Sequence, residues 1–145
     1  MNAKCDSQEL LKKSGLDSTE LRDLVLKIFS ACDRALTFKN ILLKIHKFRS
    51  IDKVTLYRIL DLFVTKKIFR RMVTPKGLMA FEIICDDHRP LHAHFICRDC
   101  EKIECLSDIN LRSVRHSIQK KRHLDGEEID LKLEGTCLRC RKAKT

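Results

Sequence analysis

Two Cys-x-x-Cys motifs constrain this chain more than any other feature of its sequence. Cys97 and Cys100 form the first motif, and Cys137 and Cys140 form the second. Together they supply the four thiolates of the closed tetrahedral site that a structural zinc ion prefers. The interval between the motifs is longer than in a compact zinc ribbon, so a helix and a strand are expected between them. We therefore predict one structural zinc per subunit, which ties a C-terminal strand to the start of its domain.

A redox dithiol and unligated core cysteines are the alternatives for these motifs, but a redox site would not need the second copy. Eight cysteines in a secreted domain would indicate disulfides, whereas in a reducing compartment they are more often metal ligands. No signal-type apolar run begins the chain, and no stretch reaches the roughly 20 apolar residues of a membrane span. We expect a cytoplasmic protein that has no membrane partner.

A pair of histidines directly before the first motif predicts a second metal site. His92 and His94 alternate along an expected strand, so both side chains can face one cation. The preceding strand ends with Glu82 and Cys85, which could approach the same cation. The alternative is a pair of exposed histidines beside a structural site. We predict an exchangeable, regulatory site with the candidate ligands Glu82, Cys85, His92, His94 and Cys105, and with His88 in reserve.

The first half of the chain has the pattern of a winged helix-turn-helix. Apolar residues recur at helical spacing over 18–29, 37–45 and 52–63, where Ser18 or Thr19, Thr37 and Asp52 are plausible N-caps. Two strands then flank a turn at 74–77. The chain has four glycines, two prolines and no repeat, so disorder is expected only at its ends.

The third of these helices is the expected recognition helix. Residues 1–80 contain 17 Lys and Arg against 8 Asp and Glu, whereas the remainder contains 13 against 12, and such a bias favours a polyanionic partner. On charge alone, general solubility explains the bias equally well. A recognition helix reads the major groove with its N-terminal residues, although a solvated helix face is the alternative for any one of them. Donors for DNA are expected from Lys53, Thr55, Tyr57 and Arg58, followed by Lys66, Lys67, Arg70 and Arg71, while Val54, Leu56 and Ile59 pack.

The second half predicts a separate α/β domain. Short strands are expected at 95–97 and 102–105, a helix at 108–122, and an alternating strand at 128–133. The fold class is therefore α+β, with a winged-helix domain over 1–84, a hinge over 85–90 and a metal-binding domain over 91–145.

A zinc deaminase is the enzymatic alternative, because deaminases combine His-x-Glu with Pro-Cys-x-x-Cys. Here Ile96 precedes the motif where a proline would stand, and the sequence from His92 to His94 supplies no glutamate for proton transfer. Four cysteines also leave no open coordination position for catalysis. We expect no enzymatic activity and no small-molecule substrate. A zinc-stapled protein that docks on RNA or another protein without sensing metal remains as a third class.

These features together resemble the ferric uptake regulator (Fur) family of bacterial metalloregulators, from about residue 15 to residue 140. The segment 54–60 is similar to the family's recognition helix, and Thr19 and Arg22 resemble its Thr-x-x-Arg motif. The run from His92 to Cys100 is similar to its most specific motif. The resemblance implies a homodimer in which each subunit holds a structural zinc and a regulatory metal. It also implies that the metal closes the DNA-binding arms onto a palindromic operator and represses metal-uptake or peroxide-defence genes.

Several positions depart from the family pattern. Ala35 stands where the family often has a histidine, and Cys105 where it usually has a carboxylate. The second family site lacks its ligands, because Ala93 and Ile129 occupy their places. One sensing site is therefore expected. Thiolate ligands favour zinc over hard ions, and a cysteine near the end of the wing resembles the zinc-uptake-regulator (Zur) branch. Zinc is therefore the favoured effector. A response to Fe²⁺, Mn²⁺ or peroxide is the alternative, in which Cys85 or Cys105 could be an oxidisable thiol.

Overall fold

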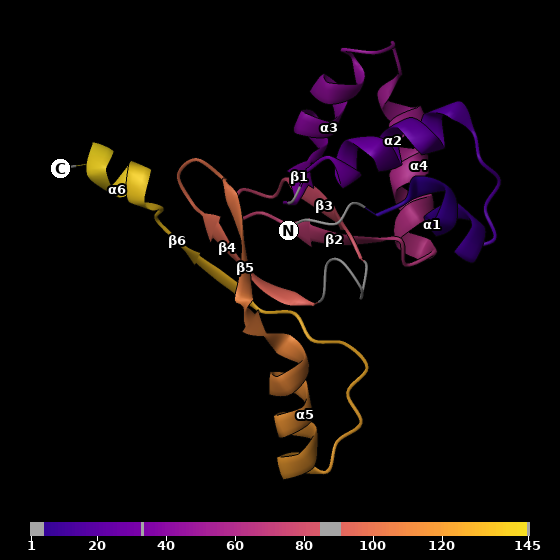
Figure 1. The fold of residues 1–145 in the computed structure, drawn as a ribbon. Coiled ribbons are helices and arrows are strands. Elements are labelled where there is room, and N and C mark those ends of the chain that lie inside the picture. Colours follow the sequence, from indigo (N-terminus) through magenta and orange to yellow (C-terminus); the bar gives the residue numbers. More distant parts are fainter. Residues whose placement is uncertain (1–4, 33, 85–90, 145) are drawn as a thin grey trace. The chain divides into compact units, whose positions relative to one another are not determined.

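The computed structural model describes residues 5–32, 34–84 and 91–144 and divides into two compact units, 1–89 and 90–145. Figure 1 shows helices α1–α4 with a small sheet in the first unit, and a second sheet with helices α5 and α6 in the other. The predicted hinge, with Cys85 and His88, lies outside the described residues. No helix among the described residues has the length and apolar character needed to cross a lipid bilayer.

Capped helices build most of the first unit. The expected caps Thr19, Thr37 and Asp52 each accept a hydrogen bond from the backbone amide three residues after the cap, which satisfies one of the free N–H groups at a helix start. The three predicted helices are confirmed as α2 (Glu20–Ser30), α3 (Phe38–Ile45) and α4 (Lys53–Thr65).

The expectation of disorder at the N-terminal end is wrong for residues 7–13, which form helix α1 (Ser7–Lys13). Asp6 caps this helix, Leu11 is fully buried, and the Ser7 hydroxyl donates a 2.6 Å hydrogen bond to Asp23 of α2. Packing against α2 therefore stabilises a helix that is too short to be stable alone.

A three-stranded antiparallel sheet completes the winged helix. Its order is β1 (Leu36–Thr37), β3 (Met79–Ile83), β2 (Phe69–Val73). One face packs on the helices, because the Phe69 ring lies 4.4 Å from that of Phe29 and 5.1 Å from that of Phe63. The turn between β2 and β3 follows the prediction, and the winged helix-turn-helix is confirmed.

The second unit contains a three-stranded sheet with β4 (His92–Cys97) at its centre. Antiparallel β5 (Ile103–Asn110) lies on one side of β4 and parallel β6 (Lys132–Gly135) on the other. Helix α5 (Leu111–Arg122) follows β5, and helix α6 (Leu138–Ala143) follows β6. The α/β character of this unit is confirmed.

Several elements of the second unit differ from the prediction, beginning with β4, which starts at His92 instead of 95. The helix begins at Leu111 and not at 108, because residues 108–110 continue β5 and the Asn110 side chain caps the helix. The last strand covers 132–135 instead of 128–133, and helix α6 was not predicted. The order of the elements is as expected, and their ends are set by caps and strand partners.

The N-cap of α4 allows a direct test of how much it contributes to the stability of the predicted recognition helix. Asp52 accepts hydrogen bonds from the Thr55 amide (2.7 Å) and hydroxyl (3.0 Å), and these bonds lower the pKa of its carboxyl group below its usual range. We expect Asp52→Ala to lower the melting temperature by about a few degrees. The carboxylate contributes stability above pH 4, and this contribution is lost as the pH falls through the lowered pKa. The melting temperatures of wild type and variant should therefore converge in acid; a constant gap down to pH 2 would contradict this role.

Candidate metal centres and DNA interface

Four cysteines from the two motifs meet at one end of the second sheet. Strands β4 and β6 run parallel, and Cys97 lies in register with Gly135, so both motifs follow the same edge of the sheet. The four Sγ atoms lie within 4.8 Å of one another, and those of Cys100 and Cys137 are 3.8 Å apart. The Cys137 amide donates a 3.3 Å hydrogen bond to Cys97 Sγ. The sequence prediction that these cysteines converge agrees with this geometry.

The local electrostatics of this cluster suit a divalent cation. Backbone amides, first that of Cys100 and then that of Cys137, lower the pKa of the Cys97 thiol to about 6. The neighbouring Cys137 thiol and burial raise the pKa of Cys140 to about 12. Four adjacent thiolates repel one another unless a cation neutralises them, and zinc binding deprotonates coordinating thiols. The donor set therefore fits a structural zinc ion.

A second group of donors lies on the facing strands of the same sheet. His94 is the cross-strand partner of Cys105, and the rings of His92 and His94 are 4.5 Å apart between centroids. One ligand atom from each of the three residues lies within 4.8 Å of the others. Both histidines are buried, and Cys105 is partly buried. Two imidazoles and a thiol at this spacing can bind a borderline-soft cation such as zinc.

The position of His92 depends on an irregularity in β5. His92 pairs with Asn110, whereas the next residue, Ala93, pairs with Leu106, so the register shifts between them. Bulges of this kind re-aim side chains and are common beside functional sites. Simple alternation along the strand predicted that the two histidines face one cation, but it did not reveal this shift.

The predicted ligand Glu82 belongs to the wing of the first unit. It lies on β3 directly opposite Arg70 of β2, and Arg70 Nη1 is 3.8 Å from Glu82 Oε1. Only 6% of the Glu82 side chain is exposed. Cys85, the fifth predicted ligand, lies outside the described residues. The fully buried Ala93 and the buried Ala35 supply no ligand atom at the positions where the family pattern has them.

The N-terminal half of α4 presents the predicted DNA-binding residues unequally. Lys53 and Arg58 are exposed, whereas the Thr55 hydroxyl donates to Asp52. The Tyr57 ring stacks on Phe38 with centroids 3.9 Å apart and an interplanar angle of 10°. Lys53 and Arg58 are therefore the residues best placed for phosphates or bases.

One detail of the predicted DNA surface needs correction. Val54 was expected to pack, but it is 58% exposed, because Leu56, Ile59, Leu60 and Phe63 form the core face on the opposite side of α4. The wing arginines are engaged in ion pairs, Arg70 with Glu82 and Arg71 with Asp61. The cationic surface therefore depends more on the helix than on the wing.

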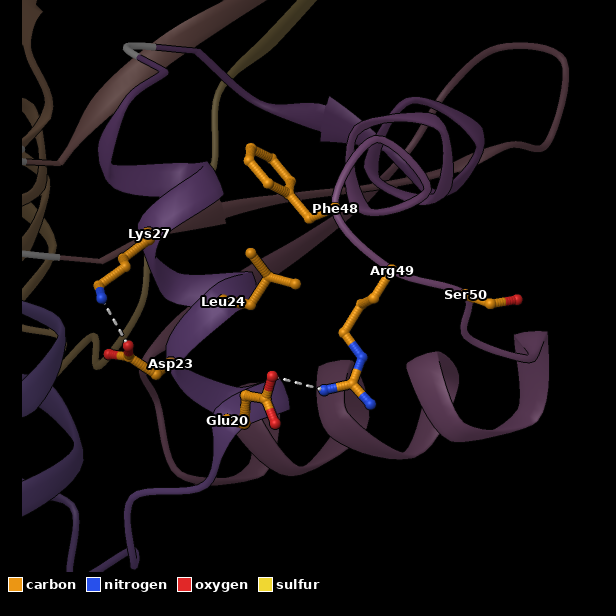
Figure 2. A pocket seen from close by; sticks show the side chains of 7 residues that line it. All are labelled: Glu20, Asp23, Leu24, Lys27, Phe48, Arg49 and Ser50. Atoms are coloured by element: carbon orange, nitrogen blue, oxygen red, sulfur yellow. Dashed lines mark ion pairs between the residues drawn. The ribbon is translucent and has the colours of Figure 1, made fainter.

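A hollow of about 520 Å³ lies between α2 and the segment after α3 (Figure 2). Its charged residues pair with each other, Arg49 with Glu20 at 3.1 Å and Lys27 with Asp23 at 2.8 Å. Leu24 and Phe48 supply the apolar part of the lining. None of the predicted site residues lines it, so the hollow is not a candidate metal site.

The sequence and fold are similar to those of known metalloregulators. The model of the ferric uptake regulator family matches residues 13–134. The ferric uptake regulation protein of Escherichia coli K12 is 30% identical over 134 residues, which cover 91% of this chain and 88% of that protein. The protein of the same name from Cupriavidus metallidurans is 29% identical over 129 residues, with 88% of both chains covered. The crystal structure of the Vibrio cholerae ferric uptake regulator superimposes with a TM-score of 0.74 at 27% identity and covers 91% of this chain and 100% of that one.

Proposed function

This chain belongs to the ferric uptake regulator family, and from that premise we propose that it is a zinc-responsive repressor of metal-uptake or metal-homeostasis genes. The family consists of DNA-binding, metal-responsive transcription regulators that work as dimers and are not enzymes. The zinc specificity, the palindromic operator, the cytoplasmic location and the homodimer of this chain are parts of the proposal. The fold of this chain, a winged helix followed by an α/β unit with four clustered cysteines, supports the parts of the proposal that concern DNA binding and a structural metal ion.

The cluster of His92, His94 and Cys105 carries the proposal of a zinc effector. Iron(II) and manganese(II) accept oxygen ligands readily, whereas a thiolate beside two imidazoles favours zinc. The relatives reported above are named for ferric uptake, so an iron-responsive regulator is the principal alternative, with manganese or peroxide response next. The thiol of Cys105 is the feature that favours zinc over these alternatives.

We assign two metal ions to each subunit. The structural zinc would be held by Cys97, Cys100, Cys137 and Cys140. The regulatory ion would be held by His92, His94 and Cys105, with Glu82 and Cys85 as further ligands. The closed four-thiolate set resists exchange, whereas a mixed set with fewer thiolates releases its ion more readily. Only the second ion can therefore follow the metal level of the cell.

In the proposed mechanism, the bound cation supplies a positive charge that several donors can share at once. His92 and His94 are fixed by β4, and Cys105 by β5, so these donors are pre-organised in the sheet. If Glu82 and Cys85 bind the same ion, metal binding favours the arrangement of the two winged-helix units of the dimer that can bind DNA. Lys53 and Arg58 then contact the operator.

Metal add-back to the purified full-length chain tests this function. The protein is isolated without oxygen, treated mildly with a chelator, and assayed for bound metal and for binding to a Fur-type palindromic duplex. We expect one zinc per chain to survive chelation, and DNA binding to return at a lower free concentration of Zn²⁺ than of Fe²⁺ or Mn²⁺. If Fe²⁺ or Mn²⁺ restores DNA binding and Zn²⁺ does not, the effector is iron or manganese and not zinc. DNA binding that does not change when metal is added would refute metal sensing. It would favour a protein in which zinc only stabilises the fold.

The variant His92→Ala should separate sensing from folding. Loss of a direct imidazole ligand is expected to weaken binding of the regulatory ion by more than the roughly 10- to 100-fold typical of losing an outer-shell partner, so that DNA binding no longer responds to physiological zinc. The structural zinc and the dimer should remain, as measured by metal analysis and sedimentation. His116→Ala is a matched control, because His116 lies exposed on α5. Unchanged metal-dependent DNA binding by His92→Ala would contradict the assigned site.

A further inference from the structure

The two β-strands of the wing place a positive side chain directly opposite a proposed metal ligand. Arg70 of β2 and Glu82 of β3 are cross-strand partners, with Arg70 Nη1 3.8 Å from Glu82 Oε1. Their side chains are 23% and 6% exposed. Water therefore screens this pair only weakly, and the register of the sheet keeps the two groups together.

A guanidinium at this position affects cation binding by Glu82. Arginine stays protonated throughout the physiological pH range, so its charge cannot be removed when a metal ion arrives. A cation that uses the Glu82 carboxylate must share it with Arg70 or displace Arg70 from it. In either case the like charges of the metal and the guanidinium repel each other at close range. A neutral hydrogen-bond donor could orient the same carboxylate without this repulsion.

We propose that Arg70 is a positioning residue that lowers the affinity of the regulatory site and so raises the metal concentration at which the protein responds. The inference rests on the proposed function, in which Glu82 is a ligand. In the metal-free state Arg70 holds and neutralises the Glu82 carboxylate. Arg70 therefore competes with the metal ion for one ligand and makes no contribution to the structural site.

The adjacent arginine provides a matched control. Arg71 points to the other face of β2, where it pairs with Asp61 of α4 and lies 5.6 Å from the centroid of the Phe81 ring. Arg70 and Arg71 have the same side chain and neighbouring positions on one strand. Only Arg70 faces the proposed ligand.

The test measures metal affinity in the absence of DNA. Arg70→Gln and Arg71→Gln are made in the full-length chain with the structural zinc in place, and a competing chelator gives the dissociation constant of the second Zn²⁺. The absorption bands of bound Co²⁺ provide an independent readout. We expect Arg70→Gln to bind the second ion about tenfold more tightly, because one nearby positive charge is removed. Arg70→Lys, which keeps the charge, and Arg71→Gln should stay close to wild type.

The remaining outcomes separate this inference from the proposed function. Unchanged or weaker binding by Arg70→Gln would overturn the competition, provided that thermal unfolding shows an intact wing. Glu82→Gln alone should weaken binding of the second ion. Arg70→Gln should not increase the affinity for this ion in the Glu82→Gln background, because the effect acts through that carboxylate. If Glu82→Gln has no effect while His92→Ala does, the inference fails and the regulatory site stands without Glu82. If neither variant changes the affinity for the second ion, the proposed function fails as well.

Discussion

Replacing Cys137 by serine is expected to remove the proposed structural zinc and to unfold the second unit. This unit spans 56 residues, 90–145, and has a small apolar core, with Ala93, Ile96, Cys97, Ile103 and Leu111 as its buried apolar residues among those described. A domain of this size often needs a metal or disulfide to fold. Zinc binding by four thiolates contributes on the order of 10 kcal/mol, more than the total stability of many small domains.

The loss should be visible as zinc content and as oligomeric state. The zinc content should fall from one retained ion per chain to near zero, as measured by metal analysis. Sedimentation should show that monomers or aggregates replace the dimers. Cys32→Ser is a suitable control, because this half-buried cysteine follows α2 in the first unit and should leave zinc binding unchanged. A Cys137→Ser protein that keeps a tightly bound zinc and a folded second unit would disprove the four-cysteine site.

The second large effect is expected from Arg58→Ala, which should weaken operator binding by about 5- to 150-fold. Arg58 is exposed on α4, and no ion pair involving it is found among the described residues. Its guanidinium is therefore available for a phosphate or for the O6 and N7 atoms of guanine. Folding, zinc content and dimerisation should not change, because the side chain contributes nothing to the core.

The salt dependence of the same complex identifies the kind of contact. If Arg58 binds a phosphate, the slope of log affinity against log salt should decrease in magnitude by about one and all sequences should be affected equally. If it reads a base, the slope should change little and specificity at one position should relax. Arg122→Ala, at the end of α5 in the second unit, is the control. Normal operator binding by Arg58→Ala would show that α4 is not the recognition helix.

Much of the first unit could be predicted because its signals are local. Thr19, Thr37 and Asp52 each precede an apolar run at helical spacing, and a cap is a contact within a few residues. The short helices α1 and α6 have seven and six residues, which is too few for a periodic pattern. They depend on tertiary contacts, such as the Ser7 to Asp23 hydrogen bond, that the sequence does not display.

The candidate site shows the same division. The spacing of the four cysteines was sufficient to predict their cluster, since few other arrangements use two such motifs. The place of Cys105 opposite His94 depends on the register of β4 with β5, which spacing alone does not define. The pairing of Arg70 with Glu82 could have been found, because residue numbers on the two arms of a hairpin have a constant sum once the turn is placed.

The parallel pairing of β4 with β6 also determines the order in which the two units of a newly synthesised chain can fold. The first cysteine motif leaves the ribosome 40 residues before the second, Cys97 before Cys137, with two thiols and no partners. The winged helix needs no residue beyond the wing for its core and can fold during this interval. Capture of the proposed structural zinc must wait for the second motif, which follows the last strand. A shortage of zinc during growth should therefore leave nascent chains with a folded DNA-binding unit and an open second unit, which is the state that proteases would remove first.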